Sequence, residues 1–375
     1  CELATTRRGA GHSINPARHP RNLRRMKETL KKWYYRHLTG DESAILAVII
    51  IGAVALFGLM GQVLTPVFIA LILAYLMQGI ADQFEKFGLP KNLALAASSL
   101  VFTGILLGFT LGVAPLVWRQ LEGLIREAPA MTAAVQLQIE MLIARYPIVV
   151  EQAPITEMLS SLQVQAASLG QAIVGFGLSS IPGVLTFAIY LVLIPLMVFF
   201  FLKDKDELIT WVLSFLPAER PSLDRIGRDV NVQIANYVRG KGIEIIIIGV
   251  ASYLAFISFD LNYTALLAVL VGLSVIVPYI GAFLVTIPVV LVAFFQFGLT
   301  GDFYWIAGLY LVIQVLDGNV LVPVLFSEAV NLHPVAIIIA ILVFGGLWGV
   351  WGVFFAIPLA TLCNVLLVSW PRTNV

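Results

Sequence analysis

Charged residues are scarce in this chain. They make up 12% of its 375 residues, whereas hydrophobic residues make up 59%. Soluble domains average about 25% charged and about 45–50% apolar residues. Several apolar runs reach the roughly 20 residues that a helix needs to cross a bilayer. This composition excludes a soluble globular domain and indicates a helical membrane protein.

Cysteine and histidine are also rare, with two and four residues. Cys363 lies inside an apolar run, which excludes a disulfide framework. The histidines and cysteines show no metal-ligand spacing. The chain has no G-x-x-x-x-G-K-[ST], H-E-x-x-H or G-x-S-x-G motif. We therefore expect no enzyme, no ATP-driven motor, no cofactor and no metal site.

Long apolar runs are what the sequence does have. They predict an all-α polytopic membrane protein with about 6–8 transmembrane helices, two of them long and either broken or re-entrant. The expected organisation is a basic cytoplasmic tail with an amphipathic helix (1–40), transmembrane helices 1–3 (41–116), an external amphipathic segment (117–180), transmembrane helix 4 (181–202), a cytoplasmic amphipathic segment (203–242) and a transmembrane core (243–370).

Two apolar runs of the last third, 264–298 and 335–369, are each about 35 residues long, too long for one straight crossing. The first is interrupted at Pro278-Tyr279-Ile280-Gly281 and the second in the glycine-rich stretch 345–352. Their shared layout makes them a candidate internal repeat of about 70 residues. Paired discontinuous helices are typical of transporter binding sites. Each run either crosses the membrane or re-enters, and the sequence leaves both options open.

Lys and Arg are distributed unevenly. Residues 1–40 hold ten, the loop 82–92 holds two and residues 203–241 hold seven. Residues 117–180 hold three, against five acids. By the positive-inside rule the N-terminus, the loop 82–92 and the segment 203–242 are cytoplasmic, and 117–180 is external. Arg372 predicts a cytoplasmic C-terminus.

A basic amphipathic helix is expected at 21–38. Its polar face carries Arg24, Arg25, Lys27, Lys31 and Lys32, opposite apolar and aromatic residues. Such a helix binds the surface of anionic lipid. A solvated tail is the alternative.

Gly104, Gly108 and Gly112 are spaced by four, which puts them on one helix face. Small residues at this spacing let a second helix approach closely. That helix belongs either to the same chain or to another copy, so a homo-oligomer is one possible consequence.

Asp317 lies inside the apolar run 304–326. A carboxylate at the centre of a bilayer costs about 2.5–3.5 kcal/mol on insertion scales. No Lys or Arg occurs between Lys241 and Arg372. Asp317 must therefore be protonated, reach a base from the first half of the chain, or meet a cation or a polar solute. An acid wetted by headgroup water near the interface is the alternative.

Asp317 heads the candidate solute- or ion-binding residues. Tyr310 and Gln314 share its helix face, whereas Asn319 points elsewhere and serves another contact. Broken backbone frees N–H and C=O groups that lipid cannot satisfy, so both breaks are expected to line a cavity. Tight helix packing is the alternative role for their glycines. The full candidate set is Asp317, Gln314, Asn319, Tyr310, Pro278, Tyr279, Gly281, Gly349 and Gly352.

The last 130 residues resemble the autoinducer-2 exporter family of bacterial membrane permeases. The resemblance is carried by Val277-Pro278-Tyr279-Ile280-Gly281, the stretch from Gln314 to Pro323, Asn331-Leu332-His333-Pro334, the stretch 345–352 and Ala356-Ile357-Pro358-Leu359. The first 240 residues fit the family in layout only. The family more often carries Glu where this chain has Asp317, which puts ligand reach in doubt. The resemblance implies a permease of the bacterial inner membrane, with members linked to export of a signalling furanone or to sodium/proton exchange.

Three functions follow as alternatives. The first is a secondary transporter of a small polar solute, such as the signalling molecule autoinducer-2, driven by an ion gradient. The second is a sodium/proton antiporter. The third is a membrane scaffold that transports nothing and organises partners through residues 117–180 and 203–242. The sequence names neither the solute, nor the direction of transport, nor the number of subunits.

Overall fold

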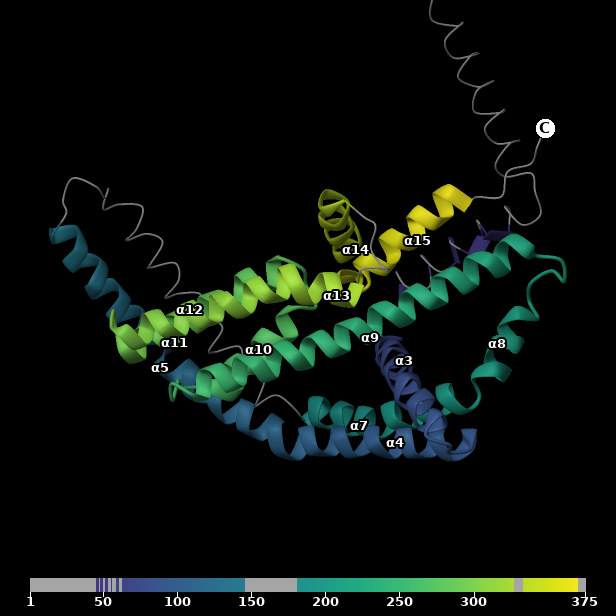
Figure 1. The fold of residues 1–375 in the computed structure, drawn as a ribbon, viewed down its shortest axis with the longest axis horizontal. Coiled ribbons are helices and arrows are strands. Elements are labelled where there is room, and N and C mark those ends of the chain that lie inside the picture. Colours follow the sequence, from purple (N-terminus) through teal and green to yellow (C-terminus); the bar gives the residue numbers. More distant parts are fainter. Residues whose placement is uncertain are drawn as a thin grey trace, which may run out of the picture.

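The computed structural model describes scattered positions between 45 and 60 and residues 63–145, 181–326 and 333–369. Within these ranges every regular element is a helix (Figure 1). Six of the described helical stretches are long and apolar enough to cross a membrane. The predicted class, an all-α polytopic membrane protein, is confirmed. The predicted helix 21–38 with its five basic residues lies outside the described residues, as do half of residues 44–61, where the first span is expected, and residues 146–180 of the external segment.

In the order of the chain, the described elements are α3 (Thr65–Lys86), α4 (Lys91–Gly108), η2 (Phe109–Val113), α5 (Ala114–Arg145), α7 (Ile181–Lys203), α8 (Lys205–Leu213), α9 (Pro221–Ile257), α10 (Thr264–Ser274), α11 (Ile280–Phe297), α12 (Gly301–Leu316), η3 (Asp317–Leu321), α13 (Val322–Phe326), α14 (Pro334–Phe354) and α15 (Ala356–Ser369). The two η segments are single π-helical turns.

One group of helices consists of α3, α4 and α7, which pack against one another. Small residues of α3, among them Ala70 and Ala74, are buried in this contact. The hydroxyl of Ser98 on α4 donates a hydrogen bond of 2.9 Å to the carbonyl of Met77 on α3. Figure 1 shows α4 and α7 side by side along one edge of the molecule, with α3 leaving them towards α9.

The helix of the third expected span does not end where the charged segment begins. The helix continues from α4 through the π turn η2 into α5, so the expected boundary at 116/117 falls inside one helical rod. A Cβ added at Gly104, Gly108 or Gly112 would meet no other atom within 4 Å. In the described part of the chain, these glycines are therefore not used for packing between helices.

The longest helix, α9, crosses another expected boundary, the one at 242/243. Gly240 and Gly242 allow its close contacts here. A Cβ on Gly240 would lie 2.6 Å from the ring of Phe326 on α13, and one on Gly242 would lie 2.6 Å from the side chain of Leu76 on α3. Because α9 also contacts α10, α12 and α15, it joins the α3–α4–α7 group to the rest of the protein.

The first broken run forms a helical hairpin. After α10 ends, the chain turns through residues 275–279, with Tyr279 at φ +62°, and returns as α11. A Cβ on Gly281 would overlap the carbonyl oxygen of Ser274, so only glycine fits this turn. At the open end, the side chain of Gln296 accepts from the amide of Asn262 (2.7 Å) and donates to the carbonyl of Asp260 (2.8 Å). The run therefore begins and ends at the same place, so it forms a hairpin rather than one straight rod.

The second broken run doubles back in the same way. Its turn is at Gly349, which has φ +59° and ψ −135° inside α14. A Cβ on Gly352 would overlap the carbonyl oxygen of Phe344, eight residues earlier. The following helix, α15, packs against α14. The second interruption lies inside the predicted stretch 345–352, whereas the first, at 275–279, overlaps the predicted break Pro278–Gly281 and begins three residues before it.

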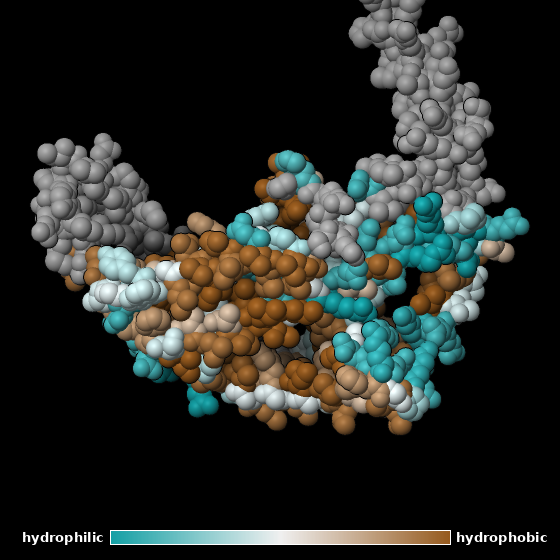
Figure 2. Space-filling model, viewed as in Figure 1, coloured by the Kyte–Doolittle hydropathy of each residue, from teal (hydrophilic) through white to brown (hydrophobic). Residues whose placement is uncertain are grey.

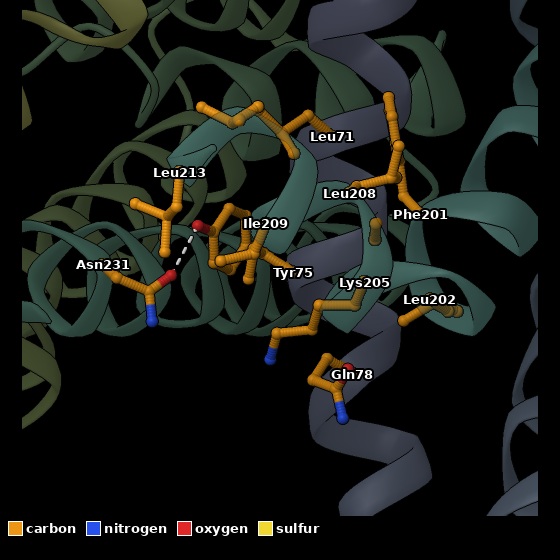
Figure 3. A pocket seen from close by; sticks show the side chains of 12 residues that line it. Leu71, Tyr75, Gln78, Phe201, Leu202, Lys205, Leu208, Ile209, Leu213 and Asn231 are labelled. Atoms are coloured by element: carbon orange, nitrogen blue, oxygen red, sulfur yellow. Dashed lines mark hydrogen bonds between the residues drawn. The ribbon is translucent and has the colours of Figure 1, made fainter. Parts of the chain in front are cut away.

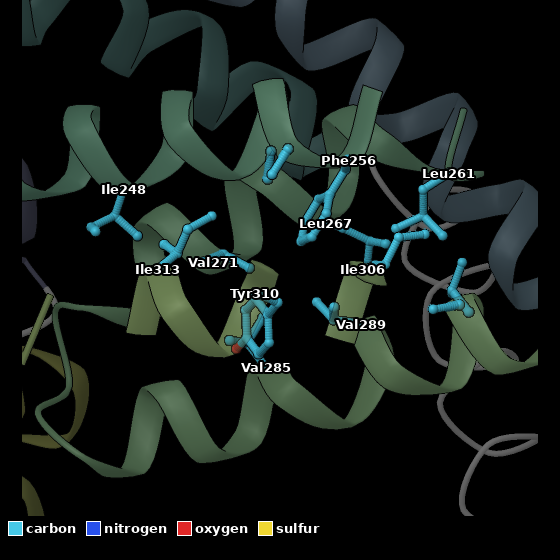
Figure 4. Packing of buried hydrophobic residues seen from close by; sticks show 14 of the residues in the cluster. Ile248, Phe256, Leu261, Leu267, Val271, Val285, Val289, Ile306, Tyr310 and Ile313 are labelled. Carbon is cyan, nitrogen blue, oxygen red and sulfur yellow. The ribbon is translucent and has the colours of Figure 1, made fainter. Parts of the chain in front are cut away.

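The main hydrophobic core lies where α10 and α11 meet α9 and α12. Figure 4 shows Phe256, Leu267, Val289 and Ile306 converging there with Tyr310. The outer surface is strongly apolar as well, and Figure 2 shows a continuous brown area over one face. Large apolar side chains such as Val192 on α7 and Phe283 on α11 are 70% and 71% exposed. Such a surface is stable when it faces lipid.

Candidate functional site

A cavity of about 390 Å³ lies where both hairpins and α12–η3–α13 meet α9. Tyr237, Lys241 and Glu244 of α9 form one wall. The turn between α10 and α11 forms a second wall, and the region from Gln314 to Phe326 forms a third. Ile337 and Ile357 of the second hairpin complete the lining.

Lys241 and Glu244 form a buried ion pair in the α9 wall. They are only 5% and 1% exposed, and the Lys241 Nζ lies 3.0 Å from Oε1 and 2.8 Å from Oε2 of Glu244. Nζ also donates to the carbonyl of Val275, at 2.8 Å, just after α10. Its remaining side faces the ring of Phe326, 5.2 Å from the centroid. A buried ion pair requires such additional hydrogen bonds to offset its desolvation.

Tyr237 makes the matching contact to the second hairpin. Its hydroxyl donates a hydrogen bond of 3.0 Å to the carbonyl of Phe354 at the end of α14. Tyr237 and Lys241 are four residues apart, so they lie on one face of α9, one turn from each other. This face of α9 therefore donates one hydrogen bond to a backbone carbonyl of each hairpin, from Lys241 to Val275 and from Tyr237 to Phe354.

Asp317 and Gln314 face the cavity from the opposite side. Asp317 is the first residue of the π turn η3, and both side chains are partly buried. Among the described residues, neither Oδ1 of Asp317 nor Nε2 of Gln314 has a hydrogen-bond partner. Lys241 lines the same cavity, but its ammonium group is engaged by Glu244 and by the carbonyl of Val275. Among the described residues no base forms an ion pair with Asp317, so the three predicted alternatives for this carboxylate stay open.

The other predicted residues lie in different places. Pro278 and Tyr279 line the cavity beside Gln314 and Asp317. Tyr310 shares their helix face but does not line the cavity. It is 3% exposed, and its hydroxyl is 2.9 Å from that of Thr286 on α11. Tyr310 lies one helical turn before Gln314, and at that level α12 packs against α11 instead of bordering the cavity. Tyr310 is therefore a core residue.

Asn319 and three glycines are also not brought into the cavity lining. Asn319 is exposed and donates back to the carbonyl of Val315, a contact within its own helix. Gly281, Gly349 and Gly352 instead form the two reversals of the chain. Gly281 and Gly352 allow a close backbone approach within each reversal, whereas Gly349 supplies a positive φ and an added Cβ there would meet no atom within 4 Å.

The sequence interpretation missed the α9 wall. Tyr237 and Lys241 were placed in the cytoplasmic segment 203–242 because the charges around them are numerous, and Glu244 fell at the start of the transmembrane core without being named as a candidate. One signal was present: Lys241 and Glu244 are three residues apart and directly precede an uninterrupted apolar run. An oppositely charged pair at that spacing shares a helix face and can be buried together. Within the described ranges, no group of three or more His, Cys, Asp or Glu residues is placed to hold a metal ion.

Water access to the cavity is testable with thiol chemistry. Ser274 lines the cavity, whereas Ser252 on α9 is fully buried. In a chain whose two cysteines are replaced by alanine, we expect Ser274→Cys to react with a water-soluble maleimide many times faster than Ser252→Cys. Labelling is measured by mass spectrometry on protein in membranes. Equal inertness of both variants would show that the cavity is closed to water.

Two helical hairpins that meet a cavity with ionisable residues inside an apolar helical protein are an arrangement typical of membrane transporters. The comparisons with known proteins agree. The family model described as "AI-2E family transporter" matches residues 44–372, and the chain belongs to this family. The resemblance seen in the motifs of the last third is thereby confirmed.

Relatives match over nearly the whole chain. "Putative permease PerM" of Escherichia coli (strain K12) is 45% identical over 346 residues, which cover 92% of this chain and 98% of that protein. "Putative transport protein YueF" of Bacillus subtilis (strain 168) is 27% identical over 320 residues, covering 82% of this chain and 84% of that protein. The chain is thus a multi-pass membrane protein of a permease family.

Proposed function

We propose that this protein is a secondary transporter that binds a small polar solute in the cavity between α9, the first hairpin and η3, and that an ion gradient drives it. The observation that carries the proposal is the pair Asp317 and Gln314. Both residues line a space of about 390 Å³ inside an apolar protein, and one buried polar atom of each, Oδ1 of Asp317 and Nε2 of Gln314, has no hydrogen-bond partner among the described residues. This volume falls within the roughly 300–1,000 Å³ of ligand pockets.

The chemistry of these two groups restricts the solute. The Asp317 carboxylate accepts hydrogen bonds from hydroxyl or amino groups, and the Gln314 amide donates to a solute oxygen. A hydrogen bond to a charged group contributes about 1.5–3 kcal/mol. A compact molecule with several hydroxyl groups fits both roles, and a signalling molecule such as autoinducer-2 is one candidate.

Sodium/proton exchange is the second candidate, and the same carboxylate supports it. Lys241 is hydrogen-bonded to Glu244 and Val275. Asp317 therefore has no positively charged partner within hydrogen-bonding distance among the described residues, and a bound cation or proton would neutralise its carboxylate.

The proposed location is the bacterial inner membrane, with both termini in the cytoplasm. The ends of α3 and α7 carry Lys86 and Lys203, and α4 and α8 begin with Lys91 and Lys205. Lys91 forms an ion pair with Asp206 at 3.1 Å, so these helix ends lie at one side of the protein. The positive-inside rule supports a cytoplasmic position for that side.

A flux assay tests the proposal. Proteoliposomes with an imposed ion gradient are loaded with a panel of small polyhydroxylated solutes, and release is compared with that from protein-free liposomes. We expect gradient-dependent release of at least one solute. A pH-sensitive dye inside the vesicles, with and without external sodium, detects exchange instead. Absence of both fluxes would contradict transport and favour the scaffold.

A further inference from the structure

A second pocket, of about 320 Å³, lies away from the cavity, between α3, α7, α8 and α9 (Figure 3). The short helix α8 closes it on one side through Leu208, Ile209 and Leu213. The floor includes Ala74 of α3 and Leu202 of α7, which are 6% and 3% exposed. Eight of its twelve lining residues are apolar aliphatic or phenyl side chains. Water is poorly held in such a space.

The polar residues of this pocket are largely engaged with protein partners. The Tyr75 hydroxyl donates to Oδ1 of Asn231 at 2.7 Å, and Nε2 of Gln78 donates to Oδ1 of Asp82 at 2.7 Å. Lys205 is different, because among the described residues it has no hydrogen-bond or ion-pair partner. Figure 3 shows Lys205 beside Gln78 at one end of the pocket, with Leu71 two turns of α3 away at the other. The pocket thus has one cationic end and a long apolar body.

The cationic end lies at the level where a membrane surface is expected. The apolar span of α7 ends at Lys203, and α8 begins two residues later at Lys205. Trp211 and Phe215, beside the end of α8, are 62% and 71% exposed and stack edge to face, with centroids 5.2 Å apart. Exposed aromatic residues of this kind anchor proteins at the headgroup layer. Anionic headgroups are concentrated in the cytoplasmic leaflet.

We propose that this pocket binds an anionic phospholipid, with one acyl chain between α3, α7, α8 and α9 and with the headgroup phosphate at Lys205. The apolar body matches a hydrocarbon chain, and the unpaired ammonium matches a single negative charge. A long Lys side chain can lie along the acyl chain while its ammonium group reaches the headgroup. A lipid held here bridges α3 and α7 to α9.

The role of the lipid's negative charge is tested by native mass spectrometry of the full-length protein, titrated with anionic phosphatidylglycerol or with zwitterionic phosphatidylethanolamine. We expect the wild-type protein to retain phosphatidylglycerol preferentially. Lys205→Gln should weaken that retention about fivefold, since one Lys near an anionic surface contributes about 1 kcal/mol and 1.4 kcal/mol is tenfold. Lys203→Gln, outside the pocket, is the matched control and should retain the preference. Equal retention of both lipids by the wild-type protein, or no effect of Lys205→Gln, overturns the proposal.

A second pair of variants tests whether an acyl chain occupies the pocket. Ile209 lines the pocket, whereas its neighbour Thr210 does not. Ile209→Trp should fill the space and abolish tight retention of either lipid, and Thr210→Trp should leave it unchanged. Both proteins must first elute as single species with wild-type helical content. Retention by Ile209→Trp at the wild-type level would show that the lipid binds elsewhere.

Discussion

Replacing Asp317 by Asn is expected to abolish ion-coupled transport while leaving the protein folded. The amide keeps the shape of the side chain but removes the charge that faces the cavity. Loss of one charge-assisted hydrogen bond, about 1.5–3 kcal/mol, weakens solute or cation binding roughly 10- to 150-fold. The change is measured as flux in proteoliposomes at equal reconstituted protein, across a range of pH.

Asp302→Asn is the matched control, because it makes the same chemical change on the exposed first turn of α12. It should transport like the wild-type protein. Full activity of Asp317→Asn with an unchanged pH profile would remove this carboxylate from the mechanism. A parallel loss of thermal stability would instead assign it a structural role.

Gly281→Ala and Gly352→Ala are each expected to prevent correct folding of one hairpin. The added methyl group would overlap a backbone carbonyl oxygen, of Ser274 in one case and Phe344 in the other. A backbone atom cannot rotate away as a side chain can. The cost should therefore lie at the upper end of the roughly 1–3 kcal/mol seen for overpacking, or beyond it. Thermal unfolding in detergent and the elution profile measure the effect.

Gly308→Ala on α12 and Gly346→Ala on α14 provide the controls. A Cβ at either position meets no other atom within 4 Å. Alanine is also the better helix former, by about 0.8–1.0 kcal/mol in water. Both controls should unfold at or slightly above the wild-type temperature. Wild-type stability of Gly281→Ala or Gly352→Ala would mean that the corresponding turn differs from the one described here.

The sequence was sufficient for the class of protein and for the two interrupted helices. Hydropathy and run length determine spans, and Pro278 and the glycines of 345–352 interrupt helices for local reasons. Whether each run crossed or re-entered depended on contacts between distant residues. The hydrogen bonds of Gln296 with Asn262 and Asp260 close the first hairpin, and no local pattern reports them.

The candidate site was predicted on its α12 side and, through Pro278 and Tyr279, at the turn between α10 and α11, but not on α9. Helical spacing correctly put Gln314 and Asp317 on one face, but it could not show that Tyr310 meets α11 instead of the cavity. Lys241 was counted with its charged neighbours, although glycines on both sides let α9 approach α3 and α13 there. The π turn at Asp317 has no local sequence signature, because its hydrogen-bond pattern is decided by packing.

The four-residue interval between Tyr237 and Lys241 has a consequence for how this chain can vary. Each residue of an α-helix turns by about 100°, so inserting or deleting one residue between them would rotate one of the two donors away from its hairpin. The carbonyl of Val275 or of Phe354 would then lose its partner inside an apolar protein. Gly240 is restricted by its contact with the ring of Phe326, whereas the number of residues between Tyr237 and Lys241 is restricted by the two hydrogen bonds. This stretch of α9 therefore tolerates a substitution that fits the packing more readily than a change in length.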